Sequence, residues 1–205
     1  MPFIKRKPTT PTAEADVEAL ASHAAALSSP DGEVRWSAAR ALGGRAEFVP
    51  EVAAALSREQ VPRVREAMMT ALMRVGDAAS IETLLTYLRS QDAGQRATAV
   101  EALQTLPEAI LPFMPTLLAD SDSDVRVLAT ELARNMPAPD ATRILCDLIR
   151  HEEHPNVCAA AIDVLAEVGT PDAVPALTSC AERFSNTPFV SFAVSVAIAR
   201  IATGS

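Results

Sequence analysis

The amino-acid sequence predicts an all-α fold, an α-solenoid wound as a right-handed superhelix of about six antiparallel helix pairs. An apolar pattern that returns about every 30 residues is the first observation behind this prediction. The second is the composition, because 49% of the 205 residues are hydrophobic, mostly Ala and Leu, whereas only 4% are aromatic. Ala and Leu are strong helix formers, and stacked helical repeats bury them between neighbours.

An arginine after a polar turn marks the same position in the first four repeats. These junction arginines are Arg35, Arg65, Arg96 and Arg126, and the column ends where Cys158 and Ser191 replace arginine. Counted from this position, the residues at offsets 3, 6, 7 and 10 are mostly apolar. That spacing is typical of one face of an α helix, so we expect the second helix of each pair to bury this face.

Turn residues set the expected boundaries of the helix pairs. Asp31, Asp122 and Pro62 stand where second helices start, and Gly76 and Gly169 stand where they end. We expect a flexible basic tail at 1–12 and then a single repeat domain at 13–205. Its expected pairs are about 13–44, 47–76, 78–106, 108–136, 138–169 and 171–203.

The pattern Asp-x-x-Val-Arg-x-x-Ala-x-x-Ala-Leu spans Asp31 to Leu42 and returns, with drift at its end, from Asp122 to Ala133. It resembles the HEAT-repeat family, and in particular the short HEAT-like repeats of the phycobilisome-lyase type. The resemblance covers about residues 14–203 and implies a HEAT-like or armadillo-like solenoid. It implies no single function, because scaffolds, adaptors, chromophore lyases and DNA glycosylases share this architecture.

Charge and composition exclude several classes of partner. Asp and Glu outnumber Lys and Arg by 26 to 18, which argues against duplex nucleic acid and, with one Trp and one Tyr, against a DNA glycosylase. No segment has the apolar length of a membrane span or of a secretory signal. Cys146, Cys158 and Cys180 form no C-x-x-C motif and are interpreted as reduced thiols. We therefore expect a cytoplasmic bacterial protein.

Two features could carry chemistry. The junction arginines could form an anion-binding ladder, or they could bond carboxylates and turn carbonyls between repeats, which is the favoured interpretation. The segment from His151 to His154 contains two histidines and two glutamates, and the resemblance to HEAT-like metal-dependent hydroxylases would make it a metal site. Its histidines are three residues apart rather than the four of H-E-x-x-H, so a solvated turn is favoured. We expect no catalytic residue, no metal ligand and no cofactor.

The face opposite the buried one, at offsets 1, 5 and 8, is expected to line the concave side. Acids recur there in three repeats, so the sequence predicts either an acidic groove for a basic peptide or helix, or an ordinary solvated face. Trp36 with Met69 and Met73 forms either an adaptable binding patch or a part of the core. The candidate protein-binding residues on this face are Trp36, Arg40, Met73, Glu101, Glu131 and Asp163.

The last helix is apolar nearly all round from Phe189 to Ala202. A terminal repeat needs a polar outer face, so we expect Phe189, Phe192 and Val196 to dock on a second copy, on a partner or on the N-terminal tail. In the alternative, the preceding helix covers most of this surface.

Taken together, these patterns predict a non-catalytic scaffold or adaptor that binds a protein on its concave face. The alternative is an accessory subunit of an enzyme system, either phycobilin-lyase-like or related to the metal-dependent hydroxylases.

Overall fold

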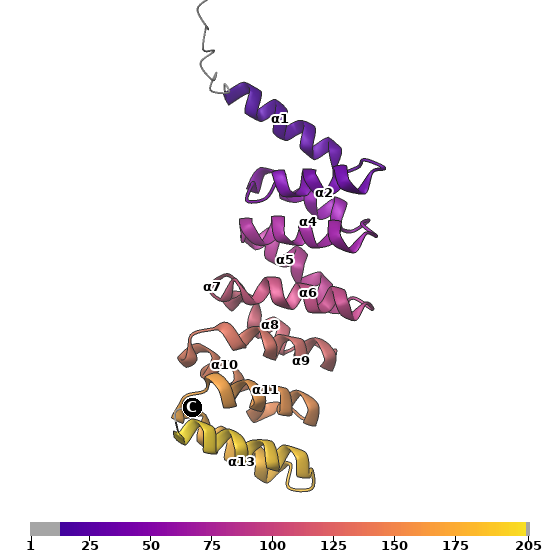
Figure 1. Ribbon diagram of the computed structural model, residues 1–205. Helices are drawn as coiled ribbons and strands as arrows, with labels where there is room; N and C mark the ends of the chain where they lie inside the picture. Colours follow the sequence, from indigo (N-terminus) through magenta and orange to yellow (C-terminus); the bar gives the residue numbers. More distant parts are fainter. Residues whose placement is uncertain (1–12, 204–205) are drawn as a thin grey trace, which may run out of the picture. The chain divides into compact units, whose positions relative to one another are not determined.

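The computed structural model describes residues 13–203, and within that range the chain forms only helices, 3-10 segments and turns (Figure 1). The all-α prediction is therefore confirmed. The tail expected at 1–12 lies outside the described residues. The chain divides into two compact units, Met1–Val75 and Gly76–Ser205.

The first unit contains two helix pairs. Helix α2 packs against both α1 and α4, and α3 packs against α4. The elements are α1 (Ala13–Ala26), α2 (Gly32–Ala41), the 3-10 segment η1 (Ala46–Phe48), α3 (Val49–Leu56) and α4 (Pro62–Val75).

The second unit contains four further pairs in two layers of helices. Helices α6, α9, α11 and α13 pack in that order in one layer, and α8, α10 and α12 pack in order in the other (Figure 1). The first helix of three of these pairs is divided into α-helical and 3-10 pieces, and one of the three contains Pro107, Pro112 and Pro115. The elements are α5 (Ala78–Thr86), η2 (Tyr87–Arg89), α6 (Ala93–Gln104), α7 (Pro107–Ile110), η3 (Leu111–Phe113), α8 (Met114–Leu118), α9 (Ser123–Leu132), η4 (Ala133–Asn135), α10 (Ala138–His151), α11 (Pro155–Val168), η5 (Pro171–Ala173), α12 (Val174–Arg183) and α13 (Pro188–Thr203).

The apolar stripe of the second helices is largely buried as its spacing predicts, although Ala41 at offset 6 of the first repeat is exposed. Each fully buried Leu or Met side chain on it contributes about 2 kcal/mol to folding by leaving water. Small residues alternate with these large ones, which lets neighbouring helices approach closely. The residues at offset 3 are buried in all six repeats: Ala38, Met68, Ala99, Ala129, Ala161 and Val194.

The helix ends follow the turn residues of the sequence. The carboxylate of Asp31 accepts a hydrogen bond from the backbone N–H of Glu33 at 2.8 Å, and Asp122 caps α9 in the same way. At the end of α4, Gly76 has a φ of 64°, in the left-handed region that favours glycine. Gly169 ends α11, where a Cβ atom would lie 2.3 Å from the Leu165 carbonyl oxygen. A side chain at 169 would therefore displace the backbone.

Candidate functional site

The junction arginines serve the fold. Each one reaches back to a carbonyl oxygen six residues earlier, in the turn that precedes its own helix. Arg35 donates to Ser29 O at 2.9 Å, and Arg126 donates to Asp120 O at 2.7 Å. These carbonyls lie at helix ends and need donors from outside the helix. The bonds of the other two run from Arg65 to Glu59 O and from Arg96 to Ser90 O.

Two junction arginines also form two-pronged ion pairs with buried glutamates of the next repeat. Nε of Arg35 lies 2.7 Å from Glu59 Oε2, and Nε of Arg126 lies 2.7 Å from Glu152 Oε2. The hydrogen bonds from Arg35 lower the pKa of Glu59. Burial alone would raise the pKa of Glu152, but the bonds from Arg126 and from the backbone N–H of His154 outweigh it and lower that pKa. The favoured structural interpretation of the column is confirmed.

Arg183 continues the role of this column after the column ends. Cys158 stands at the junction position of the fifth repeat, where its thiol lies 3.5 Å from Glu152 O. Arg183, at the end of α12, donates to that same carbonyl at 3.1 Å and to Arg150 O at 2.8 Å. The sequence prediction that the contacts stop at the fourth repeat is therefore incomplete, because a residue of the sixth pair supplies the missing guanidinium.

Two of the three predicted acidic residues meet around an arginine in the second unit. Arg134 Nη2 lies 3.0 Å from Asp163 Oδ2 and 3.0 Å from Glu131 Oε2. Its Nη1 also pairs with Glu167, a residue that sequence reasoning missed. Burial opposes the charge on Arg134, but these carboxylates raise its pKa. We call these four residues the Arg134 cluster, which holds one positive and three negative charges.

Glu101 does not join the Arg134 cluster. It is exposed on α6, and the link from α6 to α9 is made instead by Gln104, which donates to Glu131 O at 2.7 Å. The predicted acidic column is thus one exposed glutamate and one partly neutralised cluster. Glu167 could have been found from sequence, because it lies one helical turn after Asp163.

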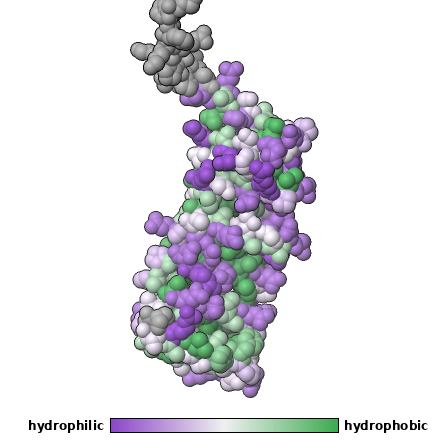
Figure 2. Space-filling view, viewed as in Figure 1, coloured by the Kyte–Doolittle hydropathy of each residue, from purple (hydrophilic) through white to green (hydrophobic). Residues whose placement is uncertain are grey.

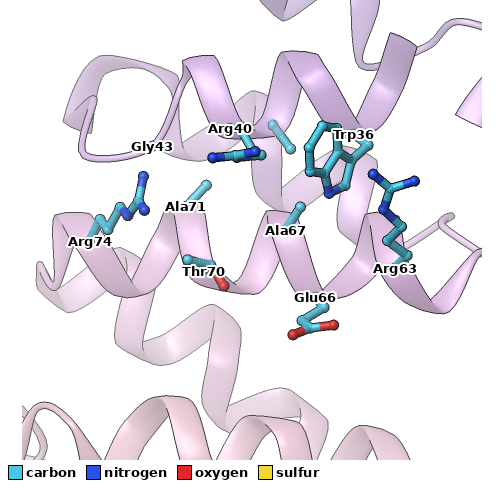
Figure 3. Close-up of a pocket in the computed structure, with 10 residues that line it drawn as sticks. Trp36, Arg40, Gly43, Arg63, Glu66, Ala67, Thr70, Ala71 and Arg74 are labelled. Atoms are coloured by element: carbon cyan, nitrogen blue, oxygen red, sulfur yellow. The ribbon is translucent and has the colours of Figure 1, made fainter. Parts of the chain in front are cut away.

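The first unit brings Trp36 and Arg40 together in an open groove between α2 and α4. Figure 3 shows the indole of Trp36 between the side chains of Arg40 and Arg63. The guanidinium carbons of these arginines lie 4.7 Å and 4.2 Å from the ring centroid, which is cation–π contact. We call the cavity the Trp36 groove; its volume is about 310 Å³, and it is lined by Trp36, Ala39, Arg40, Gly43, Arg63, Glu66, Ala67, Thr70, Ala71 and Arg74.

The floor of the Trp36 groove is made of small residues. Ala39, Ala67 and Ala71 are buried beneath it, and Gly43 lets Arg74 lie close to the backbone. A Cβ atom on Gly43 would come within 3.2 Å of Arg74 Nη1. A ligand in this groove would therefore meet arginine side chains along its walls and little bulk below.

The methionines expected beside Trp36 lie elsewhere. Met69 is buried in the core with 1% of its surface exposed, and Met73 does not line the groove. Arg63 and Arg74 were missed by sequence reasoning, although Arg74 lies four residues after Thr70 and so shares its helix face. The surface around Trp36 is thus cationic, and it is not the apolar Trp–Met patch that was one of the two sequence alternatives.

Helix α13 leaves three large apolar side chains at the surface. Phe189, Phe192 and Val196 are 49%, 70% and 38% exposed, and their spacing places them along one helix face. The space-filling view shows hydrophobic surface at the α13 end of the second unit (Figure 2). Preceding helix α12 therefore leaves this face open, although Val190, Val194 and Ala197 on the other side of α13 are buried.

Two side chains of the segment from His151 to His154 form structural bonds, whereas the buried Nδ1 of His154 has no hydrogen-bond partner among the described residues. Nδ1 of His151 lies 3.1 Å from Asp147 O, and the carboxylate of Glu152 is taken by Arg126. Among residues 13–203 there is no group of three or more His, Cys, Asp or Glu side chains placed to hold a metal ion. The cysteines of the same range are free and buried. No helix in the described part of the chain has both the length and the apolar character needed to cross a membrane.

Comparison with curated proteins finds similarity to proteins of bilin biosynthesis. The chain is 32% identical over 152 residues to "Bilin biosynthesis protein PecE" of Mastigocladus laminosus, which covers 70% of this chain and 55% of that protein. It is 39% identical over 75 residues to the protein of the same name from Nostoc sp., covering 36% of this chain and 30% of the relative. The matches thus span about half or less of the length of these relatives.

Solved structures that align with this chain include engineered proteins. A designed armadillo repeat protein aligns with 89% of this chain and 99% of its own, at 18% identity and a TM-score of 0.40. A crystal structure of an engineered protein aligns with 91% of this chain and 97% of its own, at 19% identity and a TM-score of 0.42.

The family profile described as HEAT repeats matches residues 19–104 and 110–195. These two segments contain most of the helix pairs described above, and the relatives confirm the resemblance to HEAT-like repeats of the phycobilisome-lyase type. The chain belongs to the HEAT-repeat family.

Proposed function

We propose that this protein is a non-catalytic scaffold or adaptor that holds a partner protein on the exposed face of its second helices. One observation carries the proposal. The junction arginines are bonded to backbone carbonyls of the fold, whereas Trp36 and Arg40 face an open groove. Tryptophan and arginine are common among the residues that supply most of the binding energy of protein interfaces, and this groove contains both. HEAT-repeat membership supports the proposal, because repeat arrays offer extended surfaces for binding proteins.

The Arg134 cluster offers a second surface of opposite charge. Its three carboxylates exceed its single guanidinium, and Asp163 keeps 64% of its side chain exposed. This excess supports contact with a basic peptide or helix of a partner, to which Glu101 on α6 would add a further negative charge. Met73, which is partly buried on α4, remains in the proposal as a peripheral contact of the first unit.

Affinity capture with the tagged chain, followed by mass spectrometry, tests the scaffold proposal. We expect one or a few proteins to be retained in stoichiometric amount by the wild-type chain. The charge-reversed variant Glu101→Lys/Glu131→Lys/Asp163→Lys should lose a partner that uses the second unit. Circular dichroism of the variant reports whether it keeps its helices.

A matched variant makes this test specific. Glu108→Lys/Glu153→Lys/Glu182→Lys changes the net charge equally at exposed positions outside the Arg134 cluster. We expect it to retain the partner. If no protein is captured by the wild-type chain from the cells that make it, the scaffold proposal is wrong.

The apolar side chains on α13 support a further contact. Phe189, Phe192 and Val196 form a stripe that water solvates poorly, and a second copy of the chain is one protein that could cover it. Light scattering of the purified chain tests this homodimer, since a dimer has twice the molar mass of the single chain. If the chain stays monomeric at high concentration, the homodimer is ruled out and the stripe would bind a different protein.

A second candidate function is an accessory role in bilin biosynthesis, which the two relatives favour. Bilins are open-chain tetrapyrroles with carboxylate side chains, and a subunit that handles them needs cationic or aromatic surface. Mixing the chain with biliverdin and recording its absorption spectrum tests this candidate. A shifted spectrum that co-elutes with the protein would support it, and an unchanged spectrum would contradict it.

The metal-dependent alternative is tested separately. Elemental analysis of the purified chain for iron and zinc should find less than one equivalent of either metal, because Glu152 is bonded to Arg126. One full equivalent of either metal would contradict this expectation and would require His151 to turn away from its present bond.

A further inference from the structure

We infer that the Trp36 groove binds an acidic segment of the partner protein, a stretch of chain in which Glu or Asp side chains follow one another. The inference rests on the proposed scaffold function and names the chemistry that one of its surfaces recognises. It differs from the contact proposed at the Arg134 cluster, which suits a basic segment.

The guanidinium groups of the groove keep N–H donors that form no bond within the described part of the protein. Arg40 and Arg63 both lie against the indole of Trp36, which fixes their planes without occupying their N–H donors. Among the described residues, Arg63 forms one ion pair, with Glu33 at 2.6 Å, while Arg40 and Arg74 form none. Arginines with open donors suit carboxylates, because the planar fork bonds both carboxylate oxygens at once.

Charge within the groove favours an anion. Its lining includes Arg40, Arg63 and Arg74 against a single acid, Glu66, so the lining carries a net positive charge of two. This excess stands out in a chain whose formal net charge is −8. Of the charged residues in 13–75, seven are Arg and nine are Asp or Glu, whereas 76–203 contains eight and seventeen. The first unit is therefore the part of the chain on which an acidic segment meets least repulsion.

Shape favours a peptide over a nucleic acid base. The floor of Ala39, Ala67 and Ala71 admits an extended chain, and the open volume of about 310 Å³ suits a few side chains. Single-stranded nucleic acids bind by stacking bases on exposed aromatic faces. The indole of Trp36 is already in contact with two guanidinium groups, as Figure 3 shows, so stacking a base on it would displace one of them.

Trp36 provides a direct readout, because it is the only tryptophan in the sequence. The probe is a short synthetic peptide of Glu and Ser, labelled with fluorescein, and its matched control carries Gln in place of every Glu. We expect the Glu peptide to change the emission of Trp36 and to raise the fluorescence anisotropy of the label, and the Gln peptide to do neither. Raising the NaCl concentration from about 50 to about 500 mM should weaken the binding, because salt screens exposed charges.

The variant Arg40→Gln/Arg74→Gln should bind the Glu peptide about tenfold more weakly, since two exposed charge pairs are removed. The matched variant Arg45→Gln/Arg58→Gln removes the same charge from exposed positions of the first unit that do not line the groove. It should bind as the wild-type chain does. Equal loss in both variants would contradict a built site, because it would show that only net charge matters.

Three other results would overturn the inference. They are equal binding of the Gln peptide, tighter binding of a short oligothymidylate than of the Glu peptide, and self-association of the free chain that the Arg40→Gln/Arg74→Gln variant abolishes. The scaffold proposal fails separately. If wild type and Arg40→Gln/Arg74→Gln retain the captured partner equally, the scaffold proposal holds and the inference of an acidic segment in the Trp36 groove is wrong.

Discussion

The Trp36 groove of the first unit and the Arg134 cluster of the second use the same residue type in opposite ways. Arg134 bonds Glu131, Asp163 and Glu167, so its guanidinium is saturated with carboxylates. Arg40, by contrast, rests on an aromatic ring, with its N–H donors available. An arginine on this helix face is therefore structural where several carboxylates surround it, and its donors stay available where they do not. Three predictions test this contrast, and a fourth concerns the apolar side chains of α13.

The largest effect is expected where an arginine is fully committed to the fold. Glu152→Gln removes the negative charge to which Arg126 donates two hydrogen bonds. Glu152 is only 8% exposed. We expect the free energy of unfolding to fall by about 2 kcal/mol, because a largely buried guanidinium loses its counter-charge. Urea denaturation followed by circular dichroism measures it. The neighbouring exposed variant Glu153→Gln should unfold at the wild-type midpoint, and equal loss in both would contradict the contrast.

The same ion pair predicts a pH dependence. The pKa of Glu152 in the folded chain lies below its ordinary value, so its contribution to stability is fully present above about pH 4.3 and is lost as pH falls through the folded pKa. Thermal unfolding between about pH 3 and pH 6 should show the wild type losing stability on the acid side. The Glu152→Gln variant should lose less over the same range. Parallel curves would show that this pair does not contribute to acid sensitivity.

Arg134→Gln should cost about 1 kcal/mol, because its pairs are partly exposed but three carboxylates are left facing one another. High salt should reduce the loss by screening that repulsion. The comparison is with Arg74→Gln, for which we expect an unchanged denaturation midpoint, since no carboxylate among the described residues pairs with Arg74. Destabilisation of both variants to the same extent would mean that the Trp36 groove also holds the fold together.

The smallest effect on stability is expected at the most exposed apolar residue. Phe192 keeps 70% of its surface in water, so Phe192→Ser should leave the unfolding midpoint of the monomer nearly unchanged. Any self-association of the chain should weaken, which light scattering over a range of concentrations measures. Ala199→Ser, at an exposed small residue of the same helix, is the matched control. A large loss of stability in Phe192→Ser would show that the side chain is covered in the native state.

Sequence periodicity predicted the local features of this fold well. The D-x-x-V-R pattern located the Asp31 and Asp122 caps and the buried offsets, because caps and helix faces depend on neighbours within a few residues. The bond from Arg35 back to Ser29 O recurs at the same interval in the next three repeats and is local in the same sense. The exposure of Phe192 agrees with one of the two alternatives that the apolar pattern of this helix left open.

The partners of the arginines could not be predicted in the same way. Glu59 and Glu152 lie 24 and 26 residues after the arginines that bond them. Each stands six residues before the junction position of its own repeat, but the same position is Ser90 in the third repeat, so the pattern alone does not give the pairing. Arg183, which replaces the missing junction arginine, lies 31 residues after Glu152, whose carbonyl it bonds. Which acid meets which guanidinium depends on how the helices pack, and a single sequence without its packing leaves several pairings equally open.

The bonds of Arg183 have a consequence for shortening the chain. The carbonyl groups of Arg150 and Glu152 receive their donors from α12, which belongs to the next helix pair. A truncated protein that stops after α11 would leave these carbonyls without that donor, so the last pair is not a detachable module. Cys158→Arg would restore a donor from within the fifth pair, at the position that Arg126 occupies in the fourth. A chain shortened to five pairs should therefore be more stable with this substitution than without it.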